Sequence, residues 1–198
     1  MQNKFLYLLF SIIMLSCRSK KNILPVINVE EERKNFIPVT DIIRGQLNDI
    51  DSLPITPLEI ITQNGKSDSI WMKKEDIKKW AAPFLHPEID SINLQQLYIQ
   101  KSFLDQTINA FTFAYDPSGT LPDTMQLRRW DVYVDPQKQT IKRIYLVKEE
   151  KKDSRLQTLQ LTWKTGSWAK IVIIPDKTSD LSKVKEDKMI WNFNEEQF

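Results

Sequence analysis

The chain has 198 residues, of which 41% are hydrophobic and 27% are charged, a balance typical of a globular protein rather than a disordered one. Its 28 basic and 26 acidic residues are interleaved, so no long-range field favours nucleic acid or a strongly anionic surface. The four glycines are too scattered for a phosphate-binding loop, and the single cysteine excludes an internal disulfide framework and a cysteine-rich zinc site. We therefore expect no nucleic-acid or nucleotide partner and no cofactor.

A short apolar segment follows the polar start of the chain. Phe5–Leu15 is apolar apart from the hydroxyl groups of Tyr7 and Ser11, and it follows a start that contains one lysine. A membrane-spanning helix needs about 20 apolar residues, so this segment has instead the length of a secretory leader. The segment ends at Ser16-Cys17, where a small residue directly precedes the only cysteine.

This ending resembles the lipobox of bacterial lipoprotein precursors, in which a diacylated cysteine becomes the new N-terminus. Met14 stands where the usual box has leucine, a looser form that is familiar in lipoproteins of Bacteroidetes-type bacteria. The resemblance implies a signal peptide at residues 1–16, lipidation of Cys17 and attachment to a bacterial membrane. The alternative is an ordinary secretory leader, or an uncleaved anchor, with an incidental cysteine.

Residues 17–35 are polar and charged, and we predict that they form a lipidated tether to a single domain at 36–198. In Bacteroidetes-type lipoproteins, an acidic cluster directly after the cysteine resembles a signal for display on the cell surface. The charges directly after Cys17 are positive instead. We therefore expect a location in the cell envelope, on the outer membrane with the domain facing the periplasm.

Two helices are predicted at the start of the domain. The first spans Thr40–Ile50, has apolar residues at helical spacing and uses Thr40 as its N-cap. The second spans Lys73–Ala82 and ends before Pro83. Between them, Asn64-Gly65 separates two short apolar segments and predicts a hairpin.

From Leu94 onward the apolar period changes from helical to two, which is typical of strands. Consecutive strands joined by short turns pair antiparallel, so we predict an α+β fold with an antiparallel meander of six to eight strands packed by the two helices. Curvature into a half-barrel is left open, and the mixed charges of 148–153 indicate a solvated loop. The predicted strands are Leu97–Leu104, Ile108–Tyr115, Arg129–Val134, Thr140–Lys148, Leu156–Lys164, Trp168–Pro175 and Met189–Phe193.

Aromatic residues on these strands are the main candidates for ligand binding. They either line a concave face that binds a lipid, glycan or peptide, or belong to the core. Trp130 and Tyr133 point to opposite faces of one strand, so a ligand is expected on whichever face of the sheet stays uncovered. The candidate residues are Trp130, Tyr133, Tyr145, Trp163, Trp168 and Trp191.

No catalytic motif stands out. His86 is the only histidine, and with Glu88 and Asp90 it offers a general base or a metal ligand, but a lone histidine after a helix is more simply a loop residue. A nucleophile elbow is missing. Four aspartates of the strand region are candidates for a glycosidase-type carboxylate pair, although turn chemistry accounts for the two that precede proline. These are Asp116, Asp123, Asp131 and Asp135.

The sequence therefore favours a non-enzymatic, membrane-anchored envelope lipoprotein that binds a protein partner as an accessory subunit. One alternative is a carrier of a lipid or other hydrophobic ligand on a curved aromatic sheet face, which predicts a closed apolar cavity. A second alternative is a hydrolase of envelope glycans or peptides, which predicts a cleft with two carboxylates or a polar constellation around His86.

Overall fold

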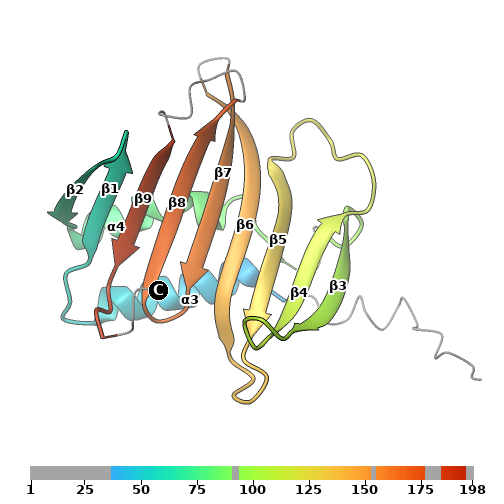
Figure 1. Cartoon of the computed structure of the whole chain (residues 1–198), viewed down its shortest axis with the longest axis horizontal. Coiled ribbons are helices and arrows are strands. Elements are labelled where there is room, and N and C mark those ends of the chain that lie inside the picture. Colours follow the sequence, from blue (N-terminus) through green and yellow to red (C-terminus); the bar gives the residue numbers. More distant parts are fainter. Residues whose placement is uncertain (1–36, 91–93, 153–154, 177–183, 195–198) are drawn as a thin grey trace, which may run out of the picture.

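The computed structural model describes residues 37–90, 94–152, 155–176 and 184–194, so the predicted signal peptide, Cys17 and the tether lie outside the described residues. One nine-stranded antiparallel sheet dominates the fold, in the order β2-β1-β9-β8-β7-β6-β5-β4-β3 (Figure 1). The predicted antiparallel architecture is confirmed, with nine strands instead of six to eight. The strands are β1 (Leu58–Gln63), β2 (Lys66–Trp71), β3 (Tyr98–Asp105), β4 (Ala110–Pro117), β5 (Leu127–Val134), β6 (Ile141–Lys152), β7 (Arg155–Lys164), β8 (Trp168–Pro175) and β9 (Lys185–Ile190).

The sheet is open, because the described ladder ends at β2 on one side and at β3 on the other without closing into a barrel. The strands from β3 to β9 follow one another in the sheet as the predicted meander. The β1–β2 hairpin also forms as predicted. Asn64 and Gly65 both have positive φ (54° and 71°), which matches the right-handed twist of a two-residue hairpin.

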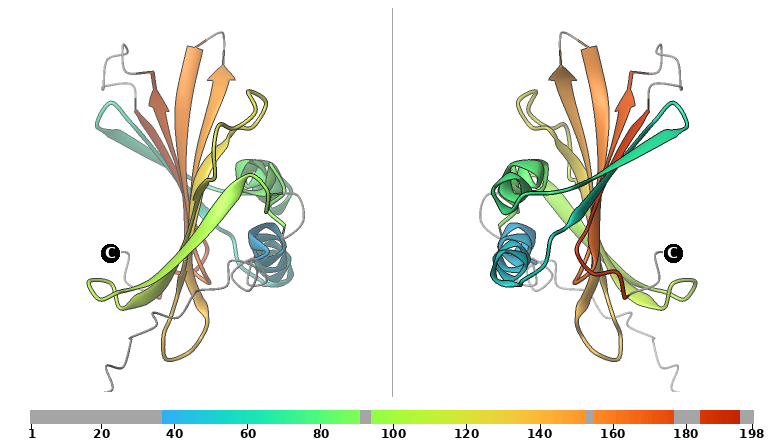
Figure 2. Two further views of the ribbon diagram at one scale, coloured as in Figure 1. Left: turned by 90° about the vertical axis from the view of Figure 1, so that its right-hand side faces the viewer. Right: turned by 90° about the vertical axis from the view of Figure 1, so that its left-hand side faces the viewer.

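Three helices cover one face of the sheet: α3 (Val39–Ser52), α4 (Lys74–Trp80) and α5 (Ala82–Leu85) (Figure 2). The predicted cap of the first helix is wrong. Pro38 holds the N-cap position without a side-chain cap, and the Thr40 hydroxyl instead accepts the N–H of Ile89 at 2.7 Å. Pro83 lies in the first turn of α5, where backbone N–H groups make no hydrogen bond within the helix, so proline is tolerated there.

The pairing of β1 with β9 is the non-local step of the topology. The ladder runs from Leu58 opposite Ile190 to Gln63 opposite Lys185, so the last strand begins and ends earlier than the predicted 189–193. This pairing adds the N-terminal hairpin beyond the end of the meander. As a result, β2 and β3 stand at opposite edges, and the segment that contains α4 and α5 crosses the sheet between them.

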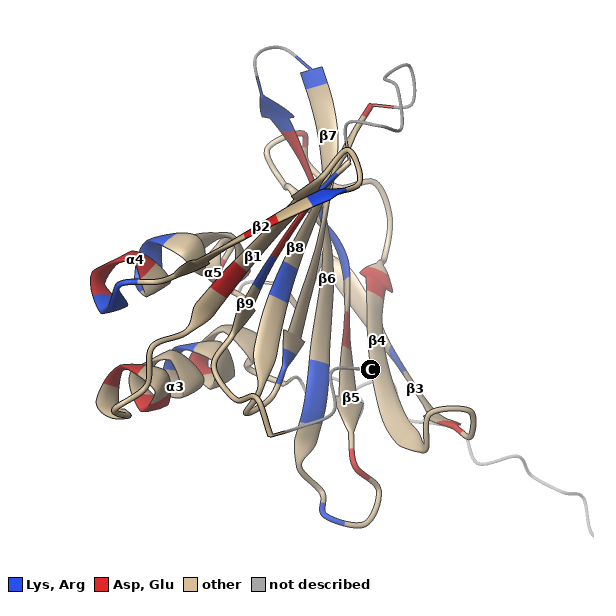
Figure 3. Cartoon of the chain, turned by 60° about the vertical axis from the view of Figure 1, so that its left-hand side comes forward, with Lys and Arg blue, Asp and Glu red and all other residues tan. Residues whose placement is uncertain are grey.

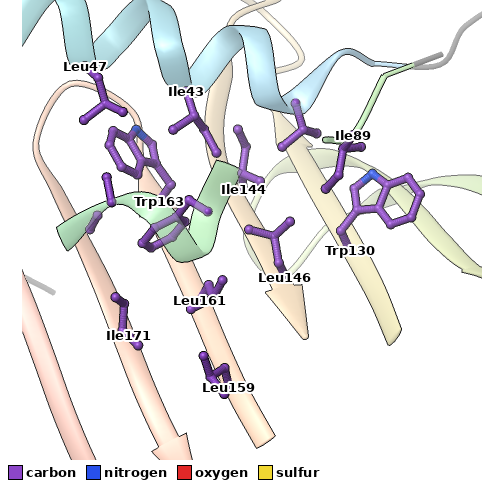
Figure 4. Close-up of a cluster of buried hydrophobic side chains, with 14 of the residues drawn as sticks. Ile43, Leu47, Ile89, Trp130, Ile144, Leu146, Leu159, Leu161, Trp163 and Ile171 are labelled. Carbon is purple, nitrogen blue, oxygen red and sulfur yellow. The ribbon is translucent and has the colours of Figure 1, made fainter. Parts of the chain in front are cut away.

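The hydrophobic core lies between the helices and the covered face (Figure 4). Trp163 lies at the centre of this core and is 0% exposed. Its ring packs on Phe84 and Trp191, with ring centroids 5.2 and 5.3 Å away. Its indole N–H donates to the Gln46 side-chain oxygen at 2.8 Å, and the same oxygen accepts the N–H of Gly166. Trp163 thus links the sheet to α3, α5 and the segment after β9.

The charged segment after residue 147 is not the predicted solvated loop, because β6 continues to Lys152. Lys148 points into the helix-covered side and is 3% exposed. Its ammonium donates to the carbonyl oxygen of Pro83 at 2.9 Å and to that of His86. Burial lowers the pKa of Lys148, and the two carbonyl groups compensate for its lost hydration. A strand lysine therefore fastens the end of α5 to the sheet.

Trp163→Ala should lower the free energy of unfolding by about 3–5 kcal/mol, because it leaves a cavity in the core and removes the hydrogen bond from the indole N–H to Gln46. Urea unfolding of the purified protein measures this. Trp71→Ala, at a ring that is 60% exposed, is the matched control and should cost about 1 kcal/mol or less. Equal losses in the two variants would contradict the central role of Trp163.

Candidate functional site

The predicted aromatic set divides between the two faces of the sheet. Trp130 and Trp163, each 0% exposed, lie in the core beneath the helices together with the buried Trp191, so a ligand on the surface does not reach them. Tyr133, Tyr145 and Trp168 are half-buried on the opposite face. Figure 2 shows that no described helix covers that face. This uncovered face is where the strand alternation predicts a ligand.

The uncovered face is polar as well as aromatic. The Arg143 guanidinium lies over the Tyr133 ring at 4.3 Å from its centroid, and the Lys188 ammonium lies over the Trp168 ring at 4.8 Å. Such cation–π contacts hold the cations beside the rings. The face therefore presents positive charge above aromatic groups rather than bare apolar rings.

Asp131 is a buried carboxylate on this uncovered face, with an exposed fraction of 4%. Arg129 donates to both of its oxygens, at 2.9 and 3.1 Å, and the Tyr133 hydroxyl donates at 3.4 Å. Burial first, and the Asp131 carboxylate second, raise the pKa of Tyr133, so its hydroxyl stays protonated at neutral pH. Asp131 is thus fully engaged in orienting its neighbours, which accounts for it without a catalytic partner.

The β3–β4 hairpin carries a second candidate surface. It crosses the plane of the central strands, so that its tip projects from the uncovered face, on the side away from the helices (Figure 2). Large apolar side chains are exposed on both of its faces and at its turn, with exposed fractions between 38% and 50%. We call these residues the hairpin patch: Ile99, Phe103, Leu104, Ile108 and Phe111.

A carboxyl pair joins β1 to β9 on the helix-covered side. Asp187 is 9% exposed and accepts the indole N–H of Trp80 at 2.8 Å and the ammonium of Lys185 at 3.2 Å. Burial, and next the negative charge of Asp187 and a hydrogen bond to it, raise the pKa of Glu59. Trp80 and Lys185 already bind the Asp187 carboxylate, which accounts for it at this strand junction without a catalytic role.

Glu59 also lines a surface hollow of about 390 Å³ between β2 and α4, beside Trp71 and Trp80. A second hollow, of about 480 Å³, lies between α3, the β7–β8 turn and the segment after β9. Both hollows lie at the rim of the helix layer. Neither contains the aromatic side chains of the uncovered face.

The other predicted catalytic groups are dispersed. His86 is exposed, and its carbonyl oxygen binds Lys148. Glu88 pairs with Arg44 at 2.6 Å, and Asp116 pairs with Lys101 at 3.0 Å. Asp123 is exposed, and Asp135 accepts the backbone N–H groups of two turn residues that follow it. Within the described ranges, no group of three or more His, Cys, Asp or Glu residues is placed to hold a metal ion.

No protein-family model, curated protein or solved structure matches the chain. In the part of the chain that the structure describes, the helices are too short or too polar to cross a membrane.

Glu59→Gln should raise the stability of the protein at neutral pH and have less effect in acid. The raised pKa means that the folded protein binds this proton more tightly than the unfolded chain, so stability falls as pH rises through that pKa. The substitution removes this loss because glutamine stays neutral. Thermal unfolding of both proteins from pH 4 to pH 8 measures the difference, and an advantage that grew toward acid would contradict the raised pKa.

Proposed function

We propose that the protein is a membrane-anchored, non-enzymatic envelope lipoprotein that binds another envelope protein as an accessory subunit. The hairpin patch is the observation that carries the proposal. Its apolar side chains are exposed at one edge of the sheet, on both faces of a single hairpin. Exposed apolar surface of this kind is typical of protein-binding sites and is a liability in a protein that works alone.

The proposed partner contributes a β-strand to this edge. β3 ends the described ladder, so its outer backbone groups have no strand partner among the described residues. A strand added there satisfies those groups, and its side chains contact Phe103 on one face and Leu104 and Phe111 on the other. The edge strand supplies main-chain hydrogen bonds, and the apolar residues supply selectivity.

The carrier of a hydrophobic ligand is less well supported. That alternative needs apolar rings that enclose a ligand, whereas Tyr133 and Trp168 on the uncovered face lie beneath cations. The hydrolase is also less well supported, because the buried Asp187 is held by Trp80 and Lys185 at a strand junction and Asp131 is held by Arg129. Binding therefore explains the described surfaces better than catalysis.

Cys17→Ser should abolish membrane attachment, because lipidation requires the thiol and the remaining leader is too short to span a bilayer. Fractionation of cells into membrane and soluble material, followed by mass determination of the processed N-terminus, measures this. Wild-type processing and membrane retention of the variant would contradict a lipid anchor on Cys17.

Replacement of Phe103 and Phe111 by serine should remove the protein partner without unfolding the sheet, since both side chains are about half exposed. We would crosslink the tagged protein in its native membrane and identify co-purifying proteins by mass spectrometry. A single stoichiometric partner should be recovered with the wild type and lost with the double variant. The matched control is Ile70→Ser, at 61% exposure on the opposite edge strand.

Amide hydrogen exchange on the purified complex then tests the mode of binding. The proposal requires slower exchange in β3 than in the free protein, because an added strand protects its outer N–H groups. Recovery of the same partner by the double variant, or unchanged exchange in β3, would contradict the proposed edge.

A further inference from the structure

We infer that the centre of the uncovered face binds an acidic glycan, through a function separate from partner binding at the hairpin patch. The residues that carry this inference are four cations on four neighbouring strands, which we call the basic strip: Arg143 on β6, Lys164 on β7, Lys170 on β8 and Lys188 on β9. Figure 3 shows basic positions along β6 and β8 in the middle of the sheet.

The register brings these cations together. Arg143 lies directly opposite Lys164, and Lys170 lies directly opposite Lys188, so each pair shares one face of the sheet. Like charges in such positions destabilise a sheet by about 0.2–1 kcal/mol per pair. Burial, and next the positive charge of Lys170, lower the pKa of Lys188, because a nearby like charge disfavours the charged form. A bound anion relieves this repulsion.

Two cations of the strip, Arg143 and Lys188, lie over aromatic rings. Lys170 pairs with Glu186 at 3.2 Å, whereas the described contacts of Arg143 and Lys188 place their charges over aromatic rings. The nearby Asp131 is already bound by Arg129. Arg143 and Lys188 therefore keep positive charge at the surface that attracts an external anion, although the chain as a whole has a net charge of only +2.

A polar hollow of about 250 Å³ opens beside the strip. Its lining consists of the Arg143 guanidinium and three hydroxyl-bearing side chains, Tyr133, Tyr145 and Thr162. Hydroxyl groups both donate and accept hydrogen bonds, so they complement the hydroxyls of a sugar, while the guanidinium complements its carboxylate or phosphate. The indole N–H of Trp168, close to Lys188, is buried without an acceptor among the described atoms.

The same geometry disfavours a peptide or a bilayer at this place. The central strands β6, β7 and β8 are paired along both edges, so only side chains are available for recognition and no strand can be added. A bilayer needs protruding apolar groups, and most of the exposed ones lie on the β1–β2 and β3–β4 hairpins at the sheet edges rather than on the strip. Hydroxyls, cations and half-buried rings together fit an acidic saccharide.

The test uses the full-length protein in detergent and measures binding by isothermal titration calorimetry at low ionic strength. The probes are polygalacturonate and a phosphomannan, with neutral dextran, poly-aspartate and vesicles that contain phosphatidylglycerol as comparisons. Polygalacturonate or phosphomannan should bind, with added salt weakening the interaction, and dextran should not. The stronger of the two acidic glycans identifies carboxylate or phosphate as the preferred group.

Two sets of variants separate glycan recognition from simple charge attraction. Replacing Lys164 and Lys188 by glutamine should weaken the acidic glycan about tenfold or more, while the same change at the exposed Lys78 and Lys79 of α4 should have little effect. Tyr145→Phe combined with Thr162→Val should weaken the glycan several-fold and leave any poly-aspartate binding unchanged.

Three results would overturn the inference. The first is no measurable binding of either acidic glycan. The second is tighter binding of poly-aspartate or of the vesicles than of the glycans. The third is an acidic-glycan affinity that is insensitive to the hydroxyl variant while circular dichroism shows an intact fold, since the strip would then attract any polyanion.

Discussion

The pairing of β1 with β9 is the constraint on which the rest of the structure depends. It extends the meander by the N-terminal hairpin and so sends β2 and β3, which are neighbours among the strands in sequence, to opposite edges of the sheet. The chain between them must cross the sheet, and it does so as α4 and α5 on the same face as α3. One face is thereby covered and the other is left uncovered. Trp163 and Lys148 then fasten the crossing segment in place, one through ring packing and the other through hydrogen bonds to carbonyl groups.

This asymmetry gives the molecule two surfaces with different chemistry. The hairpin patch is apolar and lies at an edge, where backbone groups are available to another chain. The basic strip lies in the middle of the sheet, where the backbone is fully paired and only side chains project. An edge suits a strand from a protein, and a flat array of cations and hydroxyls suits a soluble polymer. A partner and a glycan would therefore occupy different parts of the molecule without competing.

Local patterns in the sequence predicted most of the elements, because their causes are local. The Asn64-Gly65 turn and the period-two strands are examples, and the alternation correctly separated Trp130 from Tyr133. What stayed hidden depends on distant contacts. Nothing in the sequence near β9 indicates that β1 will pair with it. Nothing near Lys148 indicates that its ammonium will bind the carbonyl groups of Pro83 and His86. The basic strip was equally hidden, since a balanced net charge says nothing about which face each charge occupies.

The position of β9 also has a consequence for how the chain acquires its structure. β9 follows every other described strand in the sequence, so the N-terminal hairpin cannot join the rest of the sheet until nearly all of the described chain has been synthesised. Pairing between strands so far apart in the sequence is intrinsically slow, and apolar strands stay exposed until it forms. A protein built this way gains from protection during the interval before its last strand arrives. The length of that interval is set by the order of the strands along the chain rather than by the stability of the finished sheet.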